Sequence, residues 1–184
     1  MSADLNLEQF VIQQLAFART HLKLLEENPP IIKSKALKQA FILQMSLILK
    51  GYLCDLASLH IDENLTASLN NVLRAFVKNT ALANPEFRVQ EVRQLIEKKE
   101  SWLWQLGHME LACVLQLAQK KDAGREPESA NLANANLISV VQEFDGESAT
   151  ESTPWWEYSA EDLAKLLGDF ENMLAKHKEG SAEG

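Results

Sequence analysis

One stretch of this sequence, from Ser34 to Leu59, restricts the possible folds more than any other. The ten residues in its middle, Ala40 to Leu49, are apolar except for Gln44 and Ser46. Apolar side chains therefore fall on nearly every side of a helix, which is the pattern of a helix enclosed by other helices. We expect residues 34–59 to form the central helix of an all-α protein.

Amphipathic segments on both sides of this stretch are suited to covering it. Apolar residues recur in them at three- and four-residue spacing, as they do on one face of a helix. This pattern predicts further helices over residues 7–27, 65–79, 85–120 and 159–177. Pro29 and Pro30 end the first of them, because proline lacks the N–H that continues a helix. The sequence thus predicts an up-and-down antiparallel bundle of about five or six helices around the central helix 34–59.

Capping residues suggest where these helices begin. Ser34 is a candidate N-cap of the central helix, and residues 62–64 read as a turn. Ser101 could cap a new helix from Trp102, so 85–120 is either one bent helix or two. The run Ser159-Ala160-Glu161-Asp162 resembles a capping box at the start of the last helix.

The sequence between the last two helical segments changes in composition. Residues 121–135 are rich in Gly, Pro, Ser and Asn and read as a loop, while residues 137–141 could be extended or helical. We expect a helical bundle over 1–142, an acidic connector with an aromatic end over 143–158, a C-terminal helix over 159–177 packed on the bundle, and a disordered tail over 178–184.

The charge of the chain disfavours nucleic acid as a partner. The 184 residues carry a formal net charge of −8, whereas duplex binding depends on Lys and Arg that neutralise phosphates. Four carboxylates between residues 143 and 151 account for half of that charge. Lys33, Lys35 and Lys38 form a small basic cluster at the start of the central helix, most simply a solvated helix end.

Targeting and redox features suggest a cytoplasmic protein. The longest apolar run is about ten residues, half the length that a membrane crossing requires, and no secretory signal is recognisable. Cys54 and Cys113 both lie in apolar helical contexts. We expect them to be buried free thiols in a reducing compartment.

No motif for catalysis, a cofactor or a metal is recognisable. The sequence lacks glycine-rich phosphate loops, Cys-x-x-Cys pairs and the Glu-x-x-His pairs of di-iron bundles. His108 and Cys113 are five residues apart on one predicted helix, so they project in different directions. We therefore predict no catalytic, cofactor-binding or metal-binding residues.

Aromatic residues are the least ordinary feature of the sequence. Trp102 and Trp104 are two residues apart, so they point to different faces of a helix, and Trp155, Trp156 and Tyr158 gather just before the last helix. They could dock that helix onto the bundle. Alternatively, these five residues form an interaction surface, because Trp and Tyr are frequent in binding hot spots.

Four segments carry a resemblance to a known family: ARTHLKLL (18–25), FILQMSLILKGYLCDLASLH (41–60), ESWLWQLGHMEL (100–111) and LAKHKEG (174–180). Together they resemble a family of short, uncharacterised, all-helical bacterial proteins that is known as a domain of unknown function. The resemblance covers most of the chain. It implies a helical fold but no activity, cofactor or catalytic residue.

The first two predicted helices are also similar to those of HEPN-type helical bundles. That resemblance implies an antiparallel bundle, and some members of the class are RNases with an Arg followed, after four to six residues, by His. Here Arg19 and His21 are too close, and His108 follows Arg93 at too great a distance. The RNase activity is therefore not expected.

Three hypotheses for the function follow. The first is a non-enzymatic interaction or scaffold protein that binds a protein partner or self-associates, as a dimer in the simplest case. The second is a HEPN-like bundle in a nucleic-acid-linked or toxin–antitoxin system. The third is an enzyme of unrecognised type, which requires a pocket where polar groups from several helices converge.

Overall fold

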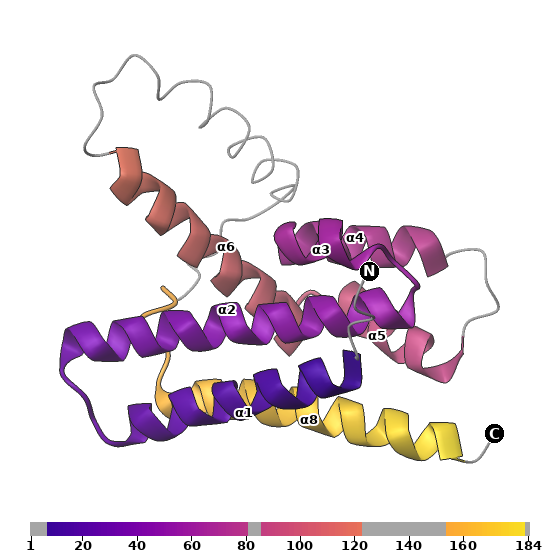
Figure 1. Ribbon diagram of the computed structural model, residues 1–184, viewed down its shortest axis with the longest axis horizontal. Helices are drawn as coiled ribbons and strands as arrows, with labels where there is room; N and C mark the ends of the chain where they lie inside the picture. The colour runs from indigo at the N-terminus through magenta and orange to yellow at the C-terminus, as the bar shows by residue number, and fades with distance from the viewer. Residues whose placement is uncertain (1–6, 81–85, 123–153, 183–184) are drawn as a thin grey trace, which may run out of the picture.

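The computed structural model describes residues 7–80, 86–122 and 154–182, and these residues form seven helices and no strand (Figure 1). The all-α prediction is confirmed. The helices are α1 (Leu7–Glu26), α2 (Ile31–Leu56), α3 (Ile61–Thr66), α4 (Leu69–Thr80), α5 (Phe87–Glu97), α6 (Trp102–Asp122) and α8 (Ala160–Ala182).

The central helix is α2, which α1, α3, α4 and α6 all contact. Its apolar side chains are buried on several sides, among them Phe41, Ile42, Met45, Leu49 and Leu53. The two polar residues that interrupt its apolar run both reach neighbouring helices. Gln44 donates a hydrogen bond to Gln14 of α1, and Ser46 donates one to Glu110 of α6. The polar positions therefore add links between helices that apolar contacts alone would not supply.

The start of α2 differs from the predicted start. The helix begins at Ile31, and the N–H of Ser34 donates to the carbonyl of Pro30 over 2.8 Å. Ser34 therefore lies inside the helix, and its predicted role as the N-cap is wrong. Pro30, with φ −52° and ψ 150°, has the extended backbone of a capping position, and its carbonyl accepts the first helical hydrogen bond.

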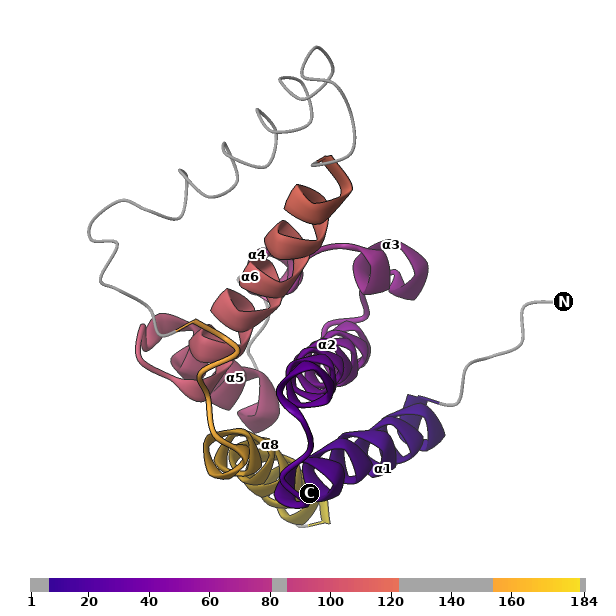
Figure 2. The ribbon, with the colours of Figure 1, turned by 90° about the vertical axis from the view of Figure 1, so that its left-hand side faces the viewer.

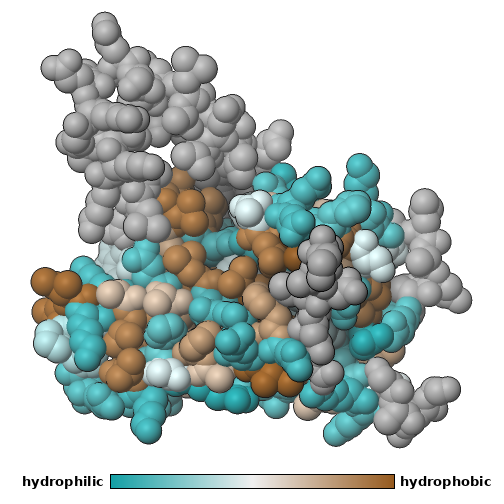
Figure 3. Space-filling model, viewed as in Figure 1, coloured by the Kyte–Doolittle hydropathy of each residue, from teal (hydrophilic) through white to brown (hydrophobic). Residues whose placement is uncertain are grey.

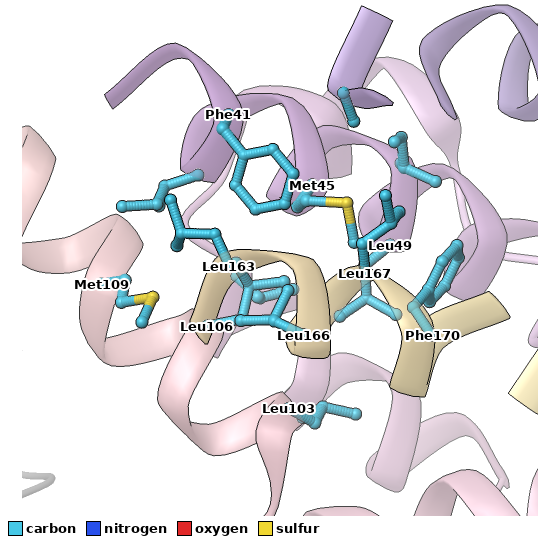
Figure 4. Packing of buried hydrophobic residues seen from close by; sticks show 14 of the residues in the cluster. Phe41, Met45, Leu49, Leu103, Leu106, Met109, Leu163, Leu166, Leu167 and Phe170 are labelled. Carbon is cyan, nitrogen blue, oxygen red and sulfur yellow. The ribbon is translucent and has the colours of Figure 1, made fainter. Parts of the chain in front are cut away.

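The long helices pack around one core. In Figure 1, α1 runs antiparallel to α2, α8 lies beside α1, and α6 crosses α2 obliquely. The same view turned by 90° places α8 next to α5 and the beginning of α6 (Figure 2). Figure 4 shows how the core is filled by side chains of α2, α6 and α8, which are Phe41, Met45, Leu49, Leu103, Leu106, Met109, Leu163, Leu166, Leu167 and Phe170.

Residues 61–80 form two helices where the sequence predicted a turn and one helix. The predicted turn at residues 62–64 is wrong because these residues lie within the short helix α3. Asp62 and Glu63 occupy its first turn, where negative charge is favourable. The chain breaks at Ser68, whose hydroxyl accepts from the N–H of Asn71, and α4 follows from Leu69.

The region 85–120 consists of two helices. α5 ends at Glu97, and α6 begins at Trp102. Ser101 joins them, because its hydroxyl donates to the carbonyl of Leu95 over 2.7 Å and accepts from the N–H of Trp104. The predicted helix start after Ser101 is therefore confirmed.

The last helix starts as predicted and ends later. Ser159 and Asp162 form a reciprocal capping box, with the N–H of Asp162 donating to Ser159 and the N–H of Ser159 donating to Asp162. Residues 178–182, which we assigned to a disordered tail, continue α8. This last part of α8 comes close to α5, because a Cβ on Gly180 would be in van der Waals contact, at 3.4 Å, with the ring of Phe87.

The predicted loop over 121–135 is wrong at its start, because residues 121 and 122 continue α6. The rest of that loop, residues 137–141 and the connector as far as residue 153 lie outside the described residues. In the part of the chain that is described, no helix combines the length and apolar character that membrane crossing requires.

Candidate functional site

The structure distributes the five predicted interaction residues over three places. Trp104 lies on one side of α6, where its ring stacks at a tilt on His108 and its indole N–H donates to the carbonyl of Ile96 over 2.6 Å. Trp102 lies on another side, with its ring edge-to-face on Phe170 of α8 at a centroid distance of 5.9 Å. Both indoles are half-buried.

The Trp155–Trp156 pair attaches the segment before α8 to the beginning of α2. Trp155 is buried, and the two indoles meet edge-to-face with centroids 5.6 Å apart. Lys35 places its ammonium 5.6 Å from the centre of the Trp156 ring, and Lys38 donates to the Trp156 carbonyl over 2.9 Å. Two lysines of the basic cluster are therefore occupied by contacts within the fold.

Trp102 and Tyr158 come together in a groove between α8 and the α5–α6 pair. Two hollows, of about 430 Å³ and 260 Å³, lie along it, and both are lined by Trp102 and Asp169. We call this feature the groove. Its remaining lining residues are Glu91, Leu95, Glu100, Gln105, Met109, Tyr158, Asp162, Lys165, Leu166, Asn172, Met173, Ala175, Lys176 and Glu179.

The large apolar and aromatic side chains that line the groove are buried or half-buried, whereas three of its five carboxylates are exposed. Its carboxylates are Glu91, Glu100, Asp162, Asp169 and Glu179, and its only cations among the lining residues are Lys165 and Lys176. Lys176 is already paired with Glu91 over 3.3 Å. The groove should therefore attract a positively charged group. Trp102 adds an aromatic ring to the lining, and such rings interact favourably with cations.

Glu91 also belongs to a polar array that joins three helices. The imidazole of His177 on α8 lies between Tyr52 of α2, which hydrogen-bonds its Nδ1, and Glu91 of α5, whose Oε2 lies 2.9 Å from its Nε2. The Tyr52 ring stacks on the imidazole, and Phe87 packs against its edge. His177 is only 3% exposed.

The electrostatics of this array fix its protonation. Burial lowers the pKa of His177 below its usual 6.5, outweighing the opposite effect of Glu91. Burial raises the pKa of Tyr52 to about 12. A neutral imidazole must then donate from Nε2 to the Glu91 carboxylate and accept the Tyr52 hydroxyl at Nδ1. Both ring nitrogens are occupied, so the array links α2, α5 and α8 rather than presenting a base to a ligand.

A second polar cluster lies beneath α4. The carboxylate of Glu110 on α6 accepts from Ser46 of α2 over 2.6 Å and from the N–H of Leu69 over 2.6 Å, and it pairs with the ammonium of Lys50. Glu110 and Lys50 are both buried. A buried carboxylate needs such partners to offset its desolvation. Because Leu69 is the first residue of α4, Glu110 of α6 also caps the N-terminus of α4.

Both cysteines are buried free thiols, as predicted. Burial raises the pKa of the Cys54 thiol, and burial together with the charge of Glu110 raises the pKa of Cys113 to about 12. A thiol that stays protonated is a poor nucleophile and a poor metal ligand. Among the described residues, no three His, Cys, Asp or Glu side chains gather as metal ligands would.

Sequence reasoning found Trp102 and Tyr158 but missed the groove and both polar clusters. Tyr52, Glu91 and His177 lie on three helices that are far apart in the sequence, so no spacing pattern connects them. The positions of Ser46 and Lys50 could have indicated the second cluster, because they are polar residues one turn apart on the central, mostly apolar helix.

No family model matches this sequence, and no significant match is found among curated proteins or solved structures. The function must therefore be inferred from the geometry of the chain itself.

Proposed function

We propose that this chain is a non-enzymatic interaction protein that self-associates as a dimer through the groove between α8 and the α5–α6 pair. The observation that carries the proposal is the position of Trp102. This half-buried indole lines both hollows of the groove, beside the carboxylate of Asp169. Tryptophan side chains in surface depressions are typical anchors of protein interfaces.

The state of the polar clusters supports binding rather than catalysis. His177 has both ring nitrogens engaged, and Glu110 has hydrogen bonds to both of its oxygens. A general base or a nucleophile must instead reach a substrate atom within hydrogen-bond distance. Chemistry at either cluster would first require one of these contacts to break.

The groove has free carboxylates that a partner could use. Among the described residues, Glu100, Asp169 and Glu179 form no ion pair, although all three line the groove. A partner segment with cationic and apolar side chains would complement both the carboxylates and the apolar side chains of the groove.

The substitution Gln105→Arg tests the proposal. Gln105 is exposed and lines the smaller hollow, so a longer, charged side chain there should obstruct the groove without disturbing the core. We expect the dimer dissociation constant measured by sedimentation velocity to rise about tenfold or more. Gln94→Arg, at an exposed position of α5 that lines neither hollow, is the matched control and should leave dimerisation unchanged. Equal dimerisation of both variants would contradict the assignment to the groove.

A further inference from the structure

The beginning of α2 carries an unusual combination of exposed apolar and cationic side chains. Ile31 and Ile32 are 76% and 86% exposed, more than any other large hydrophobic residue that the structure describes as exposed. Lys33 follows them, is exposed, and forms no ion pair among the described residues. We call Ile31, Ile32 and Lys33 the α2 tip. Figure 3 shows hydrophobic surface at the left-hand end of the molecule, where α2 begins.

We infer that the groove of one copy receives the α2 tip of a second copy, and that the second groove receives the first tip in return. This inference rests on the proposed function and names the segment that fills the groove. The charges are complementary, because the cationic tip would enter a groove with five carboxylates and two lysines. The isoleucines would bury apolar surface that is otherwise in water, against Trp102 and Met109.

The positions of the two surfaces favour a reciprocal pair. Trp156 touches Lys35 and Lys38 near the start of α2, and Tyr158, two residues later, lines the smaller hollow. The tip and one end of the groove therefore lie at the same end of the molecule, where α2 and α8 both begin (Figure 1). Two copies related by a two-fold axis can then exchange tips, which closes the assembly at a dimer.

An anionic membrane is the other surface that a basic, apolar tip could meet. The chain carries a net charge of −8, which opposes approach to such a membrane. Since the acidic groove is on the same chain and has the opposite charge to the tip, a second copy fits the observations better.

Mixing two variants tests the exchange of tips. The tip variant carries Ile32→Asp with Lys33→Glu, and the groove variant carries Glu100→Lys with Asp169→Lys. For each variant alone, the dimer dissociation constant should rise about tenfold or more. The altered surface then carries the same sign of charge as the surface that it binds, so the two repel each other. An equimolar mixture should regain dimers in sedimentation velocity, since reversed tips meet reversed grooves and native tips meet native grooves.

Controls separate the failure of this inference from the failure of the proposed function. Ile12→Asp with Lys78→Glu changes an exposed apolar and an exposed cationic residue outside both surfaces and should leave the dimer intact. A tip variant that dimerises like the unmodified protein, or a mixture that stays monomeric, overturns the exchange of tips but leaves association through the groove standing. A monomeric unmodified protein overturns both.

Vesicles of phosphatidylserine and phosphatidylcholine provide the last arm of the test. We expect the unmodified protein to remain in the supernatant when these vesicles are sedimented. Binding that the tip variant abolishes would assign the tip to a membrane surface and overturn the inference.

Discussion

At the scale of single residues, the backbone of Ser58 is the clearest source of strain. Ser58 follows α2 with a φ of 51°, and its N–H donates to the carbonyl of Asp55 while that of Leu59 donates to Cys54. This pair of bonds is a Schellman motif, in which glycine usually occupies the left-handed position. A serine with a Cβ there costs free energy that glycine would not.

Ser58→Gly should therefore raise the free energy of unfolding by about 0.5–1 kcal/mol, after the larger entropy of glycine in the unfolded chain is subtracted. Urea unfolding checks this, and the exposed position of Ser58 means that no side-chain contact is lost. Ser34→Gly, within α2, is the control and should instead destabilise the protein. A destabilised Ser58→Gly variant would show that the left-handed backbone is not strained.

At the scale of the helices, the junction of α2, α5 and α8 should respond to pH. The folded pKa of His177 lies below 6.5, so the unfolded chain binds more protons as the pH falls through 6.5. The free energy of unfolding is then largest above that pH and decreases on acidification. His21, whose pKa burial also lowers, contributes in the same direction.

His177→Gln should reduce this pH dependence, measured as the change in urea midpoint between about pH 7.5 and about pH 5.5. Part of the dependence should remain because His21 is unchanged. An equal slope for His177→Gln and the unmodified protein would show that the array does not bias the protonation of His177.

The helices also show what the sequence can and cannot specify. A nearly continuous apolar run predicted the central helix, and the local motifs at Ser101 and Ser159 predicted two helix starts, because all of these depend on neighbours along the chain. The break at Ser68 was missed, because the N–H of Leu69 is satisfied by Glu110, forty-one residues later in the sequence. The end of α8 was missed for a similar reason, since its last turn packs on Phe87 of α5.

At the scale of the whole molecule, the fold places its polar side chains in two different situations. Inside the bundle, Tyr52 hydrogen-bonds to His177, and Lys50 pairs with Glu110. The groove at the surface instead has carboxylates beside the indole of Trp102. The sequence indicated the aromatic residues of an interaction surface. It could not indicate which of them would share one surface, because that depends on how α8 packs on α6.

Sedimentation equilibrium of the full chain tests self-association most directly. We expect the mass-average molecular weight to rise with concentration from the chain mass of 20.7 kDa towards twice that value, and to fall again when salt is added, because screening weakens charge complementarity. A mass of 20.7 kDa at every concentration and every ionic strength would contradict the proposed function.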